Sequence, residues 1–271
     1  MSEYQPAVAM LPGRLRRIPW AVVLLLTIAA FCILAPLVDT LGPYRQSLSK
    51  ALSGPDAVAP FGYDHLGRSM FARMAHAIGL SLSIAAAATV TAAVIGVSLG
   101  ALASWKGGWP DRLLCLLADA TLALPALLLV LMAGVIVQST PVAFWIGLAA
   151  VQWIEFFRLS RSTMRAAMDS PAVEASRLLG FGPVHIFRFH LWPEAKPVLL
   201  TAAAFGLANA IMAIAALGFV SVGVRAPTPE LGLMMVELLP YWREAPWALA
   251  QPVLACFAIL LALNTLAGAT R

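Results

Sequence analysis

Residues Ala120–Ile154 read ATLALPALLLVLMAGVIVQSTPVAFWIGLAAVQWI, a run of 35 residues without a charged side chain. One membrane crossing needs about 20 apolar residues, because the hydrocarbon core is about 30 Å thick. The run is too long for one crossing, and the Gln138-Ser139-Thr140-Pro141 segment within it has the composition of a turn. This stretch therefore predicts two transmembrane helices joined by a short turn.

Other stretches of the chain have the same character. Charged residues are absent from Ile18–Val38, Ala77–Trp105, Pro197–Val224 and Ala245–Thr270. A segment in lipid must satisfy its own backbone polar groups, and runs of Ala, Leu and Ile lack the alternation of barrel strands. We expect an all-α integral membrane protein with six transmembrane helices, at about 19–38, 79–105, 114–137, 142–160, 198–224 and 247–266. The first is longer than the apolar part of a signal peptide, so it is expected to be an uncleaved anchor.

The composition of the whole chain leads to the same class. Apolar residues make up 61% of its 271 residues and charged residues only 11%, and the mean hydropathy is +0.86. Soluble domains carry about 25% charged residues. A soluble enzyme, a disordered chain and a secreted disulfide scaffold are therefore excluded. The net charge of +5 is better explained by an excess of basic residues on the cytoplasmic side than by binding to nucleic acid. No nucleic-acid partner is expected.

Lysine and arginine counts predict the orientation. If the N-terminus is cytoplasmic, 12 of these residues fall inside and six outside, which favours both termini inside. The expected divisions are a cytoplasmic tail 1–18, the first helix 19–38, an outer loop 39–76, a transmembrane core 77–266 that includes a cytoplasmic loop 161–196, and a C-terminal tail 267–271.

Motifs for bond-making chemistry are absent from the sequence. There is no GxxxxGK phosphate-binding loop, so ATP hydrolysis by this chain is not expected. Gly96-Val97-Ser98-Leu99-Gly100 matches GxSxG, but it lies inside an apolar span, where a nucleophile elbow does not form. The same residues form GxxxG, which allows close helix packing.

Metal-binding and cofactor-binding patterns are also lacking. Cys32, Cys115 and Cys256 stand alone in apolar stretches without ligand spacing. His65 and His76 are eleven residues apart, which is no ligand pattern, although whether either contacts a metal substrate stays open. No resident metal and no cofactor are expected.

Ionisable residues at membrane depth are candidates for function. Asp119 lies early in the third expected helix, where a contact with the cytoplasmic loop is favoured over a proton relay. Glu155 lies near the inner end of the fourth, and an i,i+3 pair with Arg158 is favoured over a functional role. Pro125 is expected to kink the third helix, either beside a pore or in ordinary packing.

The cytoplasmic loop has the most specific local signals. Ser170-Pro171 is a helix N-cap followed by proline at the first helical position, and Glu174 lies in the first turn. Gly180 is placed to end this helix, and Gly182-Pro183 predicts a turn. A second short helix is expected over about Val184–Leu191, ending before Trp192-Pro193. Such a helix–turn–helix either packs on the helix ends of its own chain or docks on a partner.

This loop resembles the EAA loop of the permease subunits of ABC importers. The family pattern is Glu-Ala-Ala, three residues, Gly, nine further residues, and then a hydrophobic-x-Leu-Pro ending. The matching residues are Glu174, Ala175, Ser176, Gly180 and Pro193. Ser176 replaces the second alanine, His190 occupies the hydrophobic position, as is common in the peptide-transport branch, and Trp192 replaces leucine.

Further segments resemble the dipeptide, oligopeptide and nickel permeases, and the six-helix form resembles the second, C-type, permease of the pair. They are 60–69 (PFGYDHLGRS), 107–111 (GGWPD) with Asp119 and 122–125 (LALP), and 215–232, which begins AALGF. Ile214 stands where the family usually has an acidic residue.

The resemblance implies a type I importer fold and a non-catalytic subunit of a multi-pass complex in the bacterial inner membrane. Its implied partners are a second permease, expected to form a heterodimer, two ATPase subunits and an extracytoplasmic solute-binding protein. The residues implied to couple to the ATPase are Glu174, Ala175, Ser176, Gly180, Phe187, His190 and Pro193.

The solute path is expected between the two permeases, with Ser98, Thr121, Asn209 and Met212 as candidates from this chain. With Ile214 in place of the usual acid, a cationic solute would lose one counter-charge. Peptides, nickel and metallophores or opine-like chelates are all compatible with the pattern. An ion-coupled secondary transporter or a structural membrane subunit is the alternative, and purification with or without ATPase subunits separates these readings.

Overall fold

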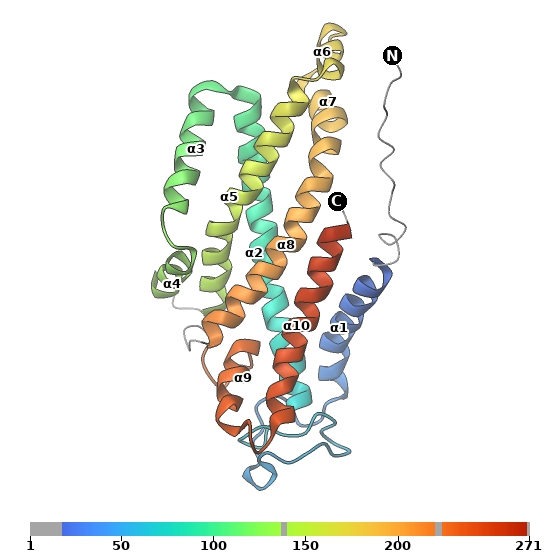
Figure 1. Ribbon diagram of the computed structural model, residues 1–271, viewed down its shortest axis with the longest axis vertical. Helices are drawn as coiled ribbons and strands as arrows, with labels where there is room; N and C mark the ends of the chain where they lie inside the picture. The colour runs from blue at the N-terminus through green and yellow to red at the C-terminus, as the bar shows by residue number, and fades with distance from the viewer. Residues whose placement is uncertain (1–17, 137–139, 220–223, 270–271) are drawn as a thin grey trace, which may run out of the picture.

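Long apolar helices lie alongside one another and form the protein (Figure 1). The computed structural model describes residues 18–136, 140–219 and 224–269, and there the regular structure is helical except for one antiparallel bridge between Tyr63 and Ser69. The principal helices are α1 (Ile18–Val38), α2 (Met70–Lys106), α3 (Gly108–Leu122), α4 (Ala126–Ile136), α5 (Thr140–Met168), α8 (Trp192–Phe219) and α10 (Pro246–Ala269). Five are long and apolar enough to cross a membrane, and the bent pair α3–α4 can supply a sixth span. The expected all-α membrane fold is confirmed.

Shorter elements lie at opposite ends of this bundle (Figure 1). At one end, here called the hairpin end, α6 (Pro171–Leu178) and α7 (Pro183–Ile186) follow α5, and the α2–α3 turn lies nearby. The other, the loop end, holds residues 39–69 and α9 (Leu231–Leu238). The two loops that the sequence places on opposite sides of the membrane therefore lie at opposite ends of the molecule.

The third expected helix, 114–137, is broken rather than kinked. Helix α3 ends at Leu122, α4 begins at Ala126, and the two axes differ by 88°. Pro125 has no N–H to donate and disfavours helical geometry at Leu124, so the helix ends just before it. The sequence prediction of one continuous span was wrong in this respect.

Close packing of α2 on α5 forms the centre of the bundle. A Cβ atom added at Gly96 would lie 2.4 Å from the carbonyl oxygen of Trp153, and one added at Gly100 would lie 2.0 Å from Oγ of Ser160. The hydroxyl oxygen of Ser160 also lies 3.4 Å from the carbonyl oxygen of Gly96 and 3.1 Å from that of Phe157. These contacts confirm that the GxxxG sequence is a helix-packing motif, which brings the two backbones together.

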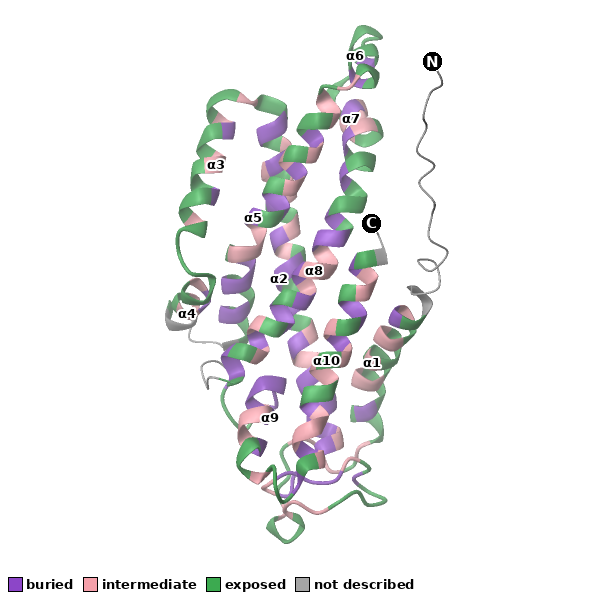
Figure 2. Ribbon diagram, viewed as in Figure 1, coloured by how far each residue is buried: buried purple, intermediate pink, exposed green. Residues whose placement is uncertain are grey.

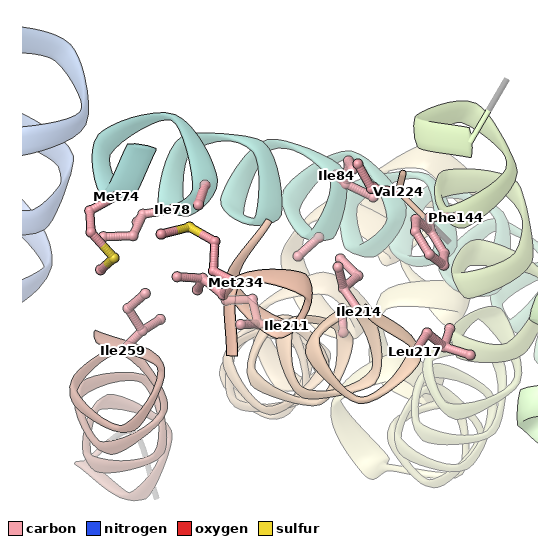
Figure 3. Packing of buried hydrophobic residues seen from close by; sticks show 14 of the residues in the cluster. Met74, Ile78, Ile84, Phe144, Ile211, Ile214, Leu217, Val224, Met234 and Ile259 are labelled. Atoms are coloured by element: carbon pink, nitrogen blue, oxygen red, sulfur yellow. The ribbon is translucent and has the colours of Figure 1, made fainter. Parts of the chain in front are cut away.

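A second core joins α2, α5, α8, α9 and α10 toward the loop end (Figure 3). Its buried residues include Met74, Ile78, Phe144, Ile211, Ile214 and Ile259. In contrast, α1 exposes much of its apolar surface, with Leu37 78% exposed (Figure 2). Because exposure of such an apolar surface to water is unfavourable, this surface is suited to contact with lipid or with another membrane protein.

Several helix boundaries differ from expectation, and α3 begins at Gly108, six residues before the expected start. Helix α2 begins at Met70, about nine residues early, because Ser69 caps it by accepting from the N–H of Ala72. Helix α5 continues to Met168. The second hairpin helix does not end before Trp192, because a π-helical turn over Phe187–Leu191 connects α7 to α8. In this turn the Trp192 N–H donates to the carbonyl of Phe187, which adapts the helix to the proline that follows.

Some sequence predictions lie outside the described residues. These are the basic segment with Arg14, Arg16 and Arg17, residues 137–139 of the expected turn, residues 220–223 at the end of the fifth expected helix, and Arg271.

Candidate functional site

The hairpin of α6 and α7 is built as the local sequence signals indicate. The hydroxyl of Ser170 accepts from the N–H of Val173, and Pro171 occupies the first turn of α6. Gly180 ends this helix at φ +80°, a conformation that costs residues with a Cβ about 1 kcal/mol or more. Gly182 is the N-cap of α7, and Pro183 opens it. The turn is therefore fixed by residues of its own.

One face of the hairpin is anchored to the bundle. Val173 of α6, Ile186 of α7 and Leu191 of the π-helical turn are buried together with Met164 of α5. Phe187 packs partly buried against the same cluster. The hairpin is therefore packed against α5 and joined directly to the start of α8.

A hydrogen bond joins the two limbs of the hairpin. The Ser176 hydroxyl oxygen lies 2.8 Å from Nε2 of His190 and 2.9 Å from the carbonyl oxygen of Ala172. A hydroxyl has one hydrogen, so when it donates to Ala172 its oxygen accepts from His190. Both residues depart from the EAA pattern, and the structure shows that the departures form one contact.

The opposite face of the hairpin is exposed and apolar. Leu178 is 84% exposed and Val184 is 77% exposed, and Leu179 and Phe181 are also exposed. Glu174 and Ala175 lie on the exposed side of α6. Pro193 follows the hairpin in the exposed first turn of α8. The hairpin thus combines one face that packs on its own chain with an uncovered apolar tip.

Sequence reasoning missed the ion pairs that brace the base of the hairpin. Asp111 in the first turn of α3 pairs with Arg161 and with Arg165 of α5, the latter at 3.0 Å. Gly107 and Gly108 precede it at φ +58° and +60°, which allows the tight α2–α3 turn. The GGWPD segment carried the signal, but its arginine partners are distant in sequence.

Charged residues nearer the membrane centre pair differently from expectation. Arg158 pairs with Asp119 of α3. The expected pair of Glu155 with Arg158 is therefore wrong, and no ion-pair partner for Glu155 is found in the part of the chain that the structure describes. Asp119 therefore makes a structural ion pair with α5, at a residue three positions before the expected cytoplasmic loop 161–196.

The four candidate path residues do not come together. Asn209 and Met212 are exposed on one face of α8. Ser98 of α2 lines a groove formed with Leu200 and other residues on the opposite side of α8, and its hydroxyl donates to the carbonyl of Val94. Thr121 lies near the end of α3, and its hydroxyl donates to the carbonyl of Leu117.

Ile214 does not face a path. It is completely buried, and Figure 3 shows its side chain within the core cluster. The expectation that this position presents or withholds a charge along the path was wrong, because the side chain points into the chain's own core.

A buried charge network holds the loop end together. Arg68 pairs with Asp64 and with Glu237 of α9, and Arg73 of α2 pairs with the same two carboxylates. Arg73 is 1% exposed. His65 stacks on the ring of Tyr241, and burial lowers the pKa of His65. Through these ion pairs, the PFGYDHLGRS segment attaches the outer loop to α9.

The same cluster is a poor metal site. Ligand atoms of Asp64, His65 and Glu237 lie within 4.8 Å of one another. Both carboxylates, however, already neutralise Arg68 and Arg73, and a metal ion would compete with these two guanidinium groups. His76 is not part of the cluster, and its Nδ1 lies 3.0 Å from the carbonyl oxygen of Ala72.

Known proteins are similar to this chain in sequence and in fold. A family model described as "binding-protein-dependent transport system inner membrane component" matches residues 92–270. The chain is 30% identical over 261 residues to the dipeptide transport system permease protein DppC of Alkalihalophilus pseudofirmus, covering 95% of this chain and 86% of that protein. It is 31% identical over 257 residues to the nickel transport system permease protein NikC of Escherichia coli, covering 93% and 92%.

A solved structure of similar fold is a chain of the MetNI methionine ABC transporter in an inward-facing conformation. The TM-score is 0.56 at 20% identity, over 73% of this chain and 96% of that one. At this identity the likeness concerns the fold alone.

Proposed function

The chain belongs to the family of binding-protein-dependent transport system inner membrane components, and from this premise we propose that it is one of two permease subunits of an ATP-driven importer. In this proposal it forms half of the solute path and contacts an ATPase through the α6–α7 hairpin. An extracytoplasmic binding protein delivers the solute. The named relatives support a peptide or nickel as the solute.

The observation that carries the proposal is the two-sided hairpin. Its inner face is fixed to α5 and α8 through Val173, Ile186 and Leu191, while its tip exposes large apolar side chains. An exposed apolar patch on a rigid support is typical of a protein interface. Since the same element is continuous with α8, a push on its tip would reach the bundle without a flexible joint.

In this proposal the chain itself makes and breaks no bonds. ATP is hydrolysed by the partner ATPases, and the chain converts their closure into a rearrangement of helices. The hydrogen bond between Ser176 and His190 supports this role, because it keeps the two limbs of the hairpin in register while force is applied.

The proposal is tested by Leu178→Glu and Val184→Glu in the assembled importer. Both side chains are largely exposed, so the chain should fold and insert normally. We expect both variants to lose co-purifying ATPase subunits and uptake. Leu48→Glu is the matched control, because Leu48 is 73% exposed at the loop end and should leave ATPase binding intact. Retention of ATPase and of uptake in both hairpin variants would contradict the proposal.

A further inference from the structure

A cleft between α5 and α8 contains one carboxylate and no basic lining residue. The cleft has a volume of about 410 Å³ and is lined by Glu155 and Leu159 of α5 and by Pro197, Thr201 and Phe205 of α8, among others. The two helices run side by side in Figure 1. The Thr201 hydroxyl donates to the carbonyl of Pro197. Glu155 is exposed into this cleft without a counter-charge from the described chain.

The depth of Glu155 makes this position unusual. It precedes Arg161 by six residues along α5, which places it about 9 Å farther into the bundle than the ion pairs at the hairpin end. An ionised side chain at such a depth is costly in lipid and normally faces a water-filled cavity or a partner. The nearest candidate partner along the helix, Arg158, is occupied by Asp119.

The side of α8 that lines the cleft at Phe205 leads to an exposed face of the same helix. Phe205, Asn209, Met212 and Ala216 follow one another at intervals of three or four residues, so they share one side of the helix. Asn209, Met212 and Ala216 are exposed, Met212 to 61%. A solute moving along this face toward the hairpin end would pass the polar side chain of Asn209 before it reaches Glu155.

We propose that Glu155 is a binding group for solutes with a cationic side chain at the inner part of the path, where its carboxylate receives the side-chain ammonium group. This inference rests on the proposed permease function and adds a charge preference to it. The charge complementarity is simple, since the lining supplies one negative group and the solute supplies the positive one. Ile214 of α8 is buried in the core and cannot contact a solute. In this proposal the acidic group of the path therefore comes from α5.

The test uses Glu155→Gln in the complete importer, with the dipeptides Ala-Lys, Ala-Ala and Ala-Glu as probes. We expect uptake of Ala-Lys, normalised to permease level, to fall about tenfold relative to Ala-Glu, as loss of one charge-assisted hydrogen bond predicts. Glu155→Asp should retain the preference, and Glu155→Lys should reverse it. Glu194→Gln is the matched control, because Glu194 is an exposed acid on α8 that does not line the cleft.

Two results would overturn the inference. An equal change in uptake of all three dipeptides, each of which carries an α-ammonium group, would show that Glu155 does not select for the charge of the solute side chain. Loss of the second permease from the purified Glu155→Gln complex would show that the carboxylate pairs with a basic residue of that subunit instead. ATPase co-purification is measured on the same samples and reports on the proposed function, so failure of one conclusion is distinguishable from failure of the other.

Discussion

Substitutions at Gly180 separate the two possible roles of the hairpin, because the backbone and the surroundings of this residue make different demands. Its φ of +80° penalises any residue with a Cβ, by about 1 kcal/mol for alanine and less for asparagine, which tolerates this region better. Its surroundings impose no penalty within the chain, since an added Cβ would meet nothing within 4 Å. A cost of about 1 kcal/mol changes a local equilibrium only about fivefold.

The series Gly180→Ala, Gly180→Asn and Gly180→Asp therefore has two possible orders. If the hairpin only packs on its own chain, the defect follows backbone strain, and alanine is worse than asparagine. If the hairpin enters a partner's surface, the defect follows side-chain size, and asparagine and aspartate are worse than alanine. We expect the second order, with far more than a fivefold loss of uptake in Gly180→Asp although the protein is still inserted.

The assay is uptake normalised to permease level, together with ATPase co-purification. Glu174→Lys should behave like Gly180→Asp, because this exposed carboxylate has no ion-pair partner among the residues described in the structure. Gly182→Ala is the control, since Gly182 has open space around it and a φ of −75° that alanine accepts. Normal specific uptake and retained ATPase in both Gly180→Asp and Glu174→Lys would refute the coupling role of the hairpin.

Three further predictions concern topology and stability. Reporter fusions within 161–196 should indicate the cytoplasm and fusions within 39–69 the outside, and the opposite result would exclude contact with cytoplasmic ATPases. Gly100→Ala forces α2 away from α5 and should cost about 1–3 kcal/mol, seen as a lower Tm, whereas Gly79→Ala, with its nearest atom at 3.9 Å, should not lower the Tm. Because burial lowers the pKa of His65, the folded state favours the neutral ring, so stability should fall as the pH drops below about 6.5, and His65→Phe should reduce this dependence.

Local chemistry made the hairpin predictable from the sequence. The Ser170 cap, the proline after it and the glycine at φ +80° act within a few residues of each other, so their pattern is visible without a fold. The same holds for the GxxxG packing of α2. The start of α2 also has a local signal, the Ser69 cap, but the charged Arg73 just after it favoured a loop. Arg73 resembled a loop residue until its partner Glu237, 164 positions away, was brought beside it by α9.

The sequence predictions for Ile214 and Glu155 were wrong for a related reason. Periodicity shows which residues share a side of a helix, but the neighbouring helices decide which side is core. Ile214 was expected to face the path because of its place in a family pattern, but its side chain is buried in the core with Ile211 and Leu217. Glu155 was predicted to pair with its sequence neighbour Arg158, but Arg158 forms an ion pair with Asp119 of α3. Glu155 has no ion-pair partner among the described residues because Arg158 pairs with Asp119, which is 39 residues away in the sequence. Local spacing cannot predict a contact between residues so far apart.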